Sequence, residues 1–319
     1  MTPPPCATCP VAARSAALAL LLATAFALFP PLLRAQSDSS GEPADTSGFQ
    51  YELSGRFSGT QAAYRNWQEG GLNTLSFSTS LDGAAERTDG RWRQRHTLRL
   101  AFGLLTSEAD DAGEPIRKTD DLIRAESNFR YAGSGFFRLF KPTVSARVRT
   151  QFAKGFDYAE NPYPDDDPLA GREPPVQTSS FLAPGTFVET LGLTYAPRDW
   201  YTVSLSAASK QTVVRDEDLR VLYDVDPDRL ARVEAGAEIG ATLDRQLAEN
   251  VRYQSNATVF FSVGQIEEPP DALWENFITM RINSWLTTNF EFVALFDENT
   301  SNAIQLKEVL SVGVTVDFI

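Results

Sequence analysis

Segments in which apolar and polar residues alternate recur from residue 49 to the C-terminus. The last segment is the clearest, with apolar residues at 310, 312, 314, 316 and 318 and small or polar residues between them. Side chains of a β-strand point alternately to its two faces, so this period predicts strands with one apolar face. About twelve such segments begin near residues 49, 72, 91, 121, 142, 187, 201, 233, 251, 274, 286 and 304.

A soluble β-sandwich also alternates, but two features of the connections favour a transmembrane barrel. The connections run long, short, long, short, which is typical of outer-membrane barrels with long outer loops and short periplasmic turns. Aromatic residues fall at strand ends, as membrane-interface girdles require. Those expected at the short-turn end are Trp92, Phe136, Phe137, Trp200, Tyr201, Trp285 and Phe318, and those at the long-loop end are Tyr64, Trp67 and Trp274.

The C-terminus is a third feature that favours a barrel. Gly313, Val316 and Phe318 resemble the signal that the outer-membrane insertion machinery reads, although Ile319 follows the aromatic residue that usually ends the chain. We therefore predict an all-β fold over residues 49–319, a single transmembrane antiparallel β-barrel of about twelve strands. The expected location is the outer membrane of a Gram-negative bacterial cell, with outer-membrane lipid and the insertion machinery as partners.

The N-terminal residues predict targeting rather than fold. Residues 1–35 are typical of a cleaved secretory signal peptide, with Arg14 before the apolar stretch Ser15–Phe29 and a cleavage point after Ala35. A retained anchor helix is the alternative. Cys6 and Cys9 would leave with the signal, so the mature chain would contain no cysteine. Residues 36–48 predict a polar linker.

Composition excludes several classes of function. The chain has 319 residues with 29 Lys+Arg against 42 Asp+Glu, and its net charge of −13 argues against a nucleic-acid partner. The mean hydropathy of −0.25 argues against a bundle of membrane-spanning helices. One histidine in the whole chain excludes a His-rich metal site. We expect no cofactor and no metal.

The polar face of the strands predicts the lining of the lumen. Neighbouring strands supply a basic wall made of Arg93, Arg95, Arg99, Arg124, Arg130, Arg147 and Arg149. Acidic residues expected in the lumen are Glu126, Glu234, Glu238 and Glu291. A basic wall that faces acids would create a transverse field across a pore. The alternative is an interlocking Arg–Glu network that plugs a narrow lumen, because unpaired buried charge is costly.

The long loops are acidic, and one loop base carries both signs of charge. Arg117, Lys118, Asp120 and Asp121 form this loop-base cluster, which either folds inward as a constriction or lies on the rim as surface ion pairs. The acidic loops contain "DVDPD", which lacks the glycine and the closing glutamate of a calcium loop. A solvated acidic rim is therefore favoured over a calcium site.

Several strings of the chain resemble one family of bacterial outer-membrane proteins. They are "NWQEGGLN" at Asn66–Asn73, "RKTDD" at Arg117–Asp121, "TQFAKGFDY" at Thr150–Tyr158, "FLAPG" at Phe181–Gly185, "LGLTYAP" at Leu191–Pro197 and "QLKEVLSVGV" at Gln305–Val314. Together they are similar to the domain-of-unknown-function family DUF3078. This resemblance implies an outer-membrane barrel and supplies neither a reaction nor a substrate.

The leading hypothesis for function is a non-enzymatic channel for passive passage of small polar or anionic solutes. A plugged structural or interaction barrel, acting through its acidic surface loops, is the alternative. A lipid-acting enzyme is a third hypothesis, with His96 on the lipid side as its only candidate base. A hydrolase of that kind needs a nucleophile, a base and an orienting group together, and "RQRHTLRL" has no serine two residues after the histidine.

Overall fold

The computed structural model describes residues 48–62, 73–107, 116–265 and 267–319. The predicted signal peptide and nearly all of the predicted linker lie outside the described residues, as do Tyr64, Trp67 and all but the last residue of Asn66–Asn73. The chain divides into two units, Met1–Ala44 and Asp45–Ile319, and the described residues belong to the second. None of the helices in the described part of the chain is long and apolar enough to cross a membrane.

Twelve antiparallel strands close into a barrel, which confirms the predicted fold class. The first five are β1 (Gln50–Ala62), β2 (Thr74–Asp89), β3 (Trp92–Ser107), β4 (Arg117–Tyr131) and β5 (Phe140–Thr150). The others are β8 (Gly185–Arg198), β9 (Tyr201–Val213), β10 (Ala231–Ala248), β11 (Val251–Ser262), β12 (Asp271–Arg281), β13 (Leu286–Asp297) and β14 (Ser301–Asp317). All predicted strand starts lie within four residues of the observed ones.

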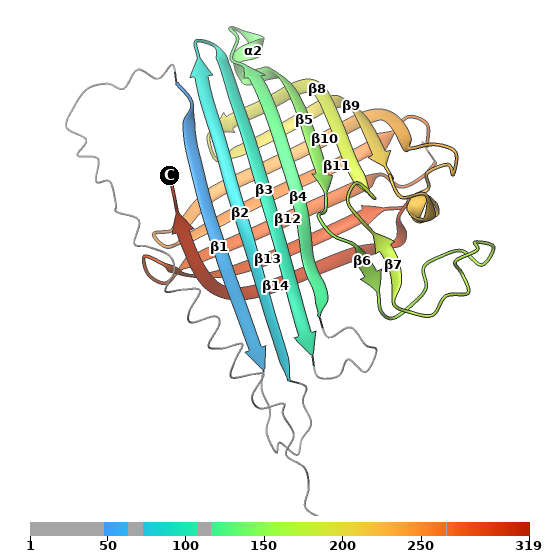
Figure 1. Ribbon diagram of the computed structural model, residues 1–319. Coiled ribbons are helices and arrows are strands. Elements are labelled where there is room, and N and C mark those ends of the chain that lie inside the picture. The colour runs from blue at the N-terminus through green and yellow to red at the C-terminus, as the bar shows by residue number, and fades with distance from the viewer. Residues whose placement is uncertain (1–47, 63–72, 108–115, 266) are drawn as a thin grey trace, which may run out of the picture. The chain divides into compact units, whose positions relative to one another are not determined.

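Each strand pairs with its neighbour in the chain, and β14 returns to pair with β1. In Figure 1 the strands β1 to β4 cross in front of β11 to β13 at a large angle, as expected when the strands of a closed barrel tilt against its axis. The short connections between strands join β2–β3, β8–β9, β10–β11 and β12–β13 at one end. The longest connections, residues 151–184 and 214–230, lie at the other end, but residues 298–300 between β13 and β14 are as short as the turns, so the predicted alternation fails at this connection.

Three small elements of the connections were not predicted from the periodicity. The helix α2 (Phe136–Leu139) is one turn between β4 and β5. The connection from β5 to β8 contains a separate two-stranded sheet of β6 (Gly155–Asp157) and β7 (Val176–Ser179). The 3-10 helix η1 (Glu217–Tyr223) lies between β9 and β10. Strands of three or four residues are too short to produce a readable alternation.

The two faces of the barrel wall are inverted relative to those of a water-soluble protein. On β9, Leu205 is 62% exposed, whereas the adjacent Ser206 is 8% exposed. On β10, Val233 is exposed and the adjacent Glu234 is buried. Apolar side chains therefore cover the outside and polar side chains fill the inside, which is the arrangement that a barrel in lipid requires.

Aromatic side chains lie where the short connections join the strands. Trp92 begins β3 and lies 5.0 Å from Tyr131 between ring centroids. Trp200 and Trp285 precede β9 and β13, and both are exposed. Of the residues expected at the opposite end, Trp274 is exposed near the start of β12. The described aromatic residues are thus placed as the girdle at the short-turn end requires, and at the long-loop end Trp274 is the one predicted member within the described residues.

The contact that closes the barrel, which we call the closing seam, is short. β1 pairs with β14 only over Ser54–Ser58 and Gly313–Asp317 within the described residues. Leu53 adds two backbone hydrogen bonds, accepting from Phe318 N at 2.8 Å and donating to Ile319 O at 3.2 Å. The residues predicted as the C-terminal insertion signal therefore lie on the seam; their recognition by the insertion machinery stays a prediction.

Close approach of the two strands explains why two residues of the seam are glycines. A Cβ atom on Gly313 would overlap the carbonyl oxygen of Phe57 and the backbone of Ser58. The ring of Phe318 covers Gly55, where an added Cβ would lie 3.1 Å from it. A glycine opposite an aromatic ring lets two strands approach closely at the point of closure.

We predict that Gly313→Val impairs closure of the barrel. Overlap with backbone atoms cannot be relieved by a rotamer change, and overpacking of this kind costs about 1–3 kcal/mol. The expected result is a clearly smaller fraction of the folded, heat-modifiable species on SDS gels after refolding into detergent. Gly171→Val is the control, because no atom lies within 4 Å of the added Cβ there. Equal folded fractions for the two variants would show that the seam tolerates a side chain at residue 313.

Candidate functional site

Ion pairs fill the middle of the barrel interior. Arg124 on β4 pairs with Glu275 on β12, and Arg149 on β5 lies 3.9 Å from the same carboxylate. Arg147 on β5 pairs with Glu238 on β10 at 2.7 Å. In the closed order of strands, β4 and β12 are six positions apart in both directions. The side chains of Arg124 and Glu275 therefore meet across the full width of the lumen.

A second group of charges surrounds Lys210 on β9 and is called the Lys210 cluster below. Its ammonium group lies 2.5 Å from Asp271, 2.9 Å from Asp297 and 3.7 Å from Glu234. Arg232 lies 3.2 Å from Glu234 on the other side. Three carboxylates thus share two cations, and Lys210 itself is only 6% exposed. Such a buried group is stabilised only while its partners remain in place.

A third group joins β3, β13 and β14. Glu291 accepts from Lys307 at 3.1 Å and from Arg99 at 3.4 Å. The guanidinium of Arg99 also lies 4.2 Å from the centroid of the Phe277 ring and 3.8 Å from Asp82. Asp82 in turn accepts from Arg56 at 2.6 Å. This group again connects strands that are not neighbours in the wall.

The remaining predicted lumen residues lie toward the short-turn end of β3, β4 and β5. Arg93 and Arg95 both pair with Glu86, at 2.7 and 2.9 Å. Arg130 faces Arg93 in the strand register, and its Nε has no hydrogen-bond partner among the described residues. Glu126 lies opposite Arg147 in the register of β4 and β5.

The predicted basic wall is therefore matched by acids rather than free to act alone on a pore. Three of the carboxylates that match this wall, Asp82, Glu86 and Glu275, were missed from the sequence, as were Asp271 and Asp297 around Lys210. The outward position of Trp274 gives by parity the inward position of Glu275, so this residue was available to sequence reasoning. Lys210, near the end of β9 (Tyr201–Val213), was also missed from the sequence.

Beside the ion pairs lies a cavity of about 210 Å³, which we call the hydroxyl cavity. Serine and threonine side chains of β1 and β2 form one side of it, and Phe277, Asn289 and Glu291 form the other. Arg56 and Arg99 also line it. The hydroxyl-bearing residues that β1 and β2 contribute are Ser58, Thr60, Ser76, Ser78, Thr79 and Ser80. Because these hydroxyl side chains are small, they leave open space beside β1 and β2. The long arginine side chains of the opposite wall leave little open space on their side.

The loop-base cluster holds the long connection between β5 and β8. Asp121 accepts the backbone N–H groups of Phe152 and Ala153 at 2.7 and 2.9 Å, and it pairs with Lys118 at 2.9 Å. The guanidinium of Arg117 stacks over Tyr158 at 4.2 Å. Asp120 instead pairs with Lys307 of β14 at 3.0 Å. The cluster thus fixes a loop and a strand rather than acting as a loose rim of surface ion pairs.

Four of the strings that resemble the family meet around this cluster. Thr150 accepts from Leu182 N at 3.0 Å and donates to Pro184 O at 3.1 Å, which joins Thr150–Tyr158 to Phe181–Gly185. Lys118 donates to Gln151 Oε1 at 3.1 Å and to Ala153 O at 3.0 Å. The strings from residues 117, 150, 181 and 305 are therefore neighbours in space.

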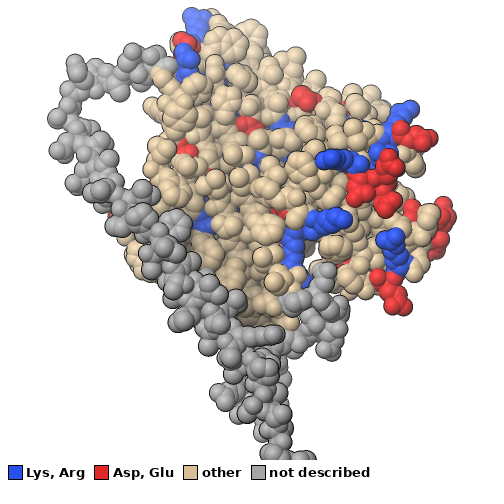
Figure 2. All heavy atoms as spheres, in the orientation of Figure 1, with Lys and Arg blue, Asp and Glu red and all other residues tan. Residues whose placement is uncertain are grey.

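The two longest described connections share a small apolar core outside the barrel wall. Its buried members are Tyr163, Val176, Ala183, Val214, Leu219 and Val225. The hydroxyl of Tyr223 donates to Thr178 O at 2.8 Å, and burial raises the pKa of this hydroxyl. Charged side chains gather at this end of the molecule in Figure 2, whereas the adjoining wall is mostly uncharged. These connections are therefore folded structure with a charged exterior.

Among the described residues, no group of three or more His, Cys, Asp or Glu is arranged to hold a metal.

The single histidine contacts a serine on the neighbouring strand. His96 Nδ1 lies 3.0 Å from Ser127 Oγ, and its ring lies between those of Phe49 and Phe129 at 6.0 and 5.5 Å. This serine comes from β4 rather than from the histidine's own strand, so sequence spacing could not reveal it. The described contacts of His96 supply no third group of the kind that orients a catalytic histidine.

We predict that Asp121→Ala releases the start of the β5–β8 connection. The change removes an ion pair and leaves two backbone N–H groups without their acceptor, at a cost of about 1–3 kcal/mol for a buried group. Limited trypsin digestion of the refolded protein should cut faster after Lys154 and Arg172, as read by mass spectrometry. Asp165→Ala, which changes an exposed acid of the same connection, should leave the rate unchanged. Similar rates for both variants would contradict an anchoring role.

Comparison with solved structures finds barrels that align over most of this chain, with low sequence identity and low TM-scores. The translocator domain of the autotransporter NalP from Neisseria meningitidis has 11% identity and a TM-score of 0.35, covering 96% of this chain and 96% of its own. The COG4313 outer membrane channel from Pseudomonas putida F1 has 11% identity and a TM-score of 0.37, covering 86% and 98%. The NanC porin has 8% identity and a TM-score of 0.37, covering 83% and 99%.

The sequence comparisons give one family. No curated protein sequence matches the chain. The family described as "Protein of unknown function (DUF3078)" matches residues 60–156, a range that contains the loop-base cluster and the start of the β5–β8 connection. The resemblance to DUF3078 is therefore confirmed over residues 60–156 of this chain.

Proposed function

We propose that this protein is a non-enzymatic outer-membrane channel of low conductance for small polar or anionic solutes. An apolar outer wall, a polar interior and the position of the longest connections at one end of the barrel support its position in an outer membrane. The observation that carries the proposal is the pairing of Arg124 with Glu275 across the lumen. A lumen spanned by paired side chains is too narrow for bulky solutes, so only the space beside the pairs is left for passage.

The hydroxyl cavity supplies that space. Hydroxyl groups donate and accept hydrogen bonds, so they replace the water of a polar solute without a fixed charge that would trap it. Arg56 and Arg99 at the border of the cavity attract anions, while Asp82 and Glu291 limit that attraction. Solutes would therefore pass along β1 and β2 rather than through the arginine-rich half of the barrel.

A sealed barrel that acts through its outer connections is the second candidate. The same cross-lumen pair supports it, because a fully satisfied ion-pair network can close a lumen. The packed apolar core of the outer connections supports it as well, since it gives these connections a fixed surface. The two candidates differ in one measurable property, the passage of ions through the folded protein.

The first test is single-channel conductance of the refolded protein in planar bilayers, in KCl with a salt gradient. Small discrete steps are expected for the native chain. Glu275→Gln should give steps several-fold larger and a reversal potential shifted toward anions, because Arg124 and Arg149 lose their shared counter-charge. Asp244→Asn is the control; it weakens the pair with Arg252, whose side chain is 48% exposed. A folded native chain and a folded Glu275→Gln variant that both lack steps would favour the sealed barrel.

The second test concerns the route. Ser80→Phe should lower the conductance, because the ring would enter the hydroxyl cavity. Leu81→Phe is the matched control, since adjacent residues of a strand point to opposite faces and this change affects the outer wall. Native conductance in Ser80→Phe would place the path elsewhere in the lumen.

A further inference from the structure

A second cavity of about 560 Å³, which we call the rim pocket, opens at the long-loop end of β9 to β12. It lies where two ladders end, with Gly236 facing Ser262 as the last pair of β10 and β11, and Phe260 facing Asp271 as the last pair of β11 and β12. Side chains from the inner and the outer face of the wall meet around this strand end. The pocket is therefore separate from the hydroxyl cavity, which lies along β1 and β2.

The body of the rim pocket is apolar. Phe260 from the inner face and Phe261, Leu205 and Val263 from the outer face contribute to its lining. Gly236 keeps the floor open, because a Cβ atom there would overlap the carbonyl oxygen of Phe261 and crowd the Phe260 ring. Both the volume and the mainly apolar lining are those of sites that bind small molecules.

The charge of the rim pocket is entirely negative among its described lining residues. Glu234, Glu268, Asp271 and Glu298 line it, whereas no lysine or arginine does. Lys210 and Arg232 do not line the pocket, and they already form ion pairs with Glu234, Asp271 and Asp297. Glu268 and Glu298 are thus carboxylates in addition to those that these two cations already balance.

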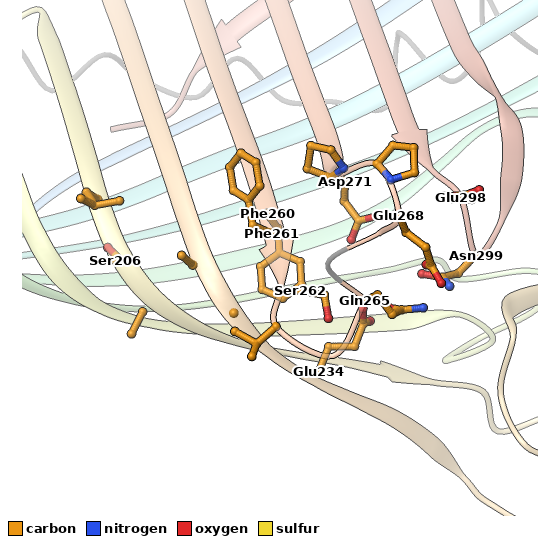
Figure 3. A pocket seen from close by; sticks show the side chains of 17 residues that line it. Ser206, Glu234, Phe260, Phe261, Ser262, Gln265, Glu268, Asp271, Glu298 and Asn299 are labelled. Carbon is orange, nitrogen blue, oxygen red and sulfur yellow. The ribbon is translucent and has the colours of Figure 1, made fainter.

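Glu298 shows where a cation would be stabilised. Its Oε2 atom is buried and has no hydrogen-bond partner within the described part of the chain. Figure 3 shows Glu268, Glu298 and Asn299 on the β12–β13 side of the pocket, with the rings of Phe260 and Phe261 on the β11 side. A buried carboxylate oxygen without a partner is costly, so a positively charged group at this position would stabilise the pocket.

We propose that the rim pocket binds a small molecule with an apolar body and a protonated amine. The ammonium group pairs with Glu298 and Glu268, and the apolar body packs against Phe260, Phe261 and Leu205. A metal ion is disfavoured as the cation, because the described residues contain no group of three or more carboxylates placed to hold one. An ammonium group needs only one or two such partners.

The test uses three probes with the same apolar body and different charge: 3-phenylpropylamine, 3-phenylpropan-1-ol and 3-phenylpropanoate. Binding is measured by isothermal titration calorimetry on the full chain in phosphatidylcholine nanodiscs, with empty nanodiscs as the blank. We expect the amine to bind at least about ten-fold more tightly than the alcohol, since a charge-assisted hydrogen bond is roughly twice as strong as a neutral one. The carboxylate should show no binding above the blank.

Two variants with matched controls locate the site. Glu298→Gln should reduce the preference for the amine over the alcohol several-fold, whereas Glu267→Gln, an exposed acid that does not line the pocket, should not. Ala237→Phe should abolish binding of both probes by filling the pocket, whereas Ala241→Phe, four residues along the same strand and outside the lining, should not. Equal affinities for amine and alcohol, or native binding in Ala237→Phe, would overturn the proposal. Neither outcome depends on conductance, so the test is independent of the proposed channel.

Discussion

Charged side chains buried inside the barrel need partners of opposite charge close by. A lumen that contains seven predicted arginines can be dry enough to pack only if acids from other strands reach them. Glu275, Glu238 and Glu291 provide this match, and each pairs with an arginine from a strand that is not next to its own in the wall. The network therefore ties strands that are not adjacent, and through Arg124 and Glu275 opposite walls, in addition to the hydrogen bonds that join adjacent strands.

The same constraint explains why the interior is uneven. The long charged side chains of β4, β5 and β9 pair with acids across the lumen, whereas β1 and β2 contribute mainly serines and threonines to the hydroxyl cavity, besides Arg56. At the outer end, Glu268 and Glu298 line the rim pocket, and among the described residues neither forms an ion pair with Lys210. The two cavities thus differ in chemistry because the supply of cations differs along the barrel.

Local periodicity predicted the strands because one face of each strand contacts lipid and the other faces the lumen. Successive residues of a strand therefore alternate between apolar and polar. It placed Arg124 and Arg147 on the polar face, but it could not state which acid each would meet. Partners such as Glu275 lie far along the chain, and the stagger of strands across a barrel is set by closure rather than by local sequence. The folded outer connections were missed for a related reason: β6 and β7 are very short, and their packing depends on Leu219 and Val225 from another connection.

The closing seam sets the order in which this barrel can form. Its five residue pairs join the two ends of the described chain, so they are the contacts with the greatest separation along the sequence. The entropic cost of bringing segments together grows with the length of chain between them, whereas the hairpins of adjacent strands need only short loops. The seam is therefore expected to form last. Until it forms, β1 and β14 each present an unpaired edge, and the nascent sheet must be kept from pairing with other chains.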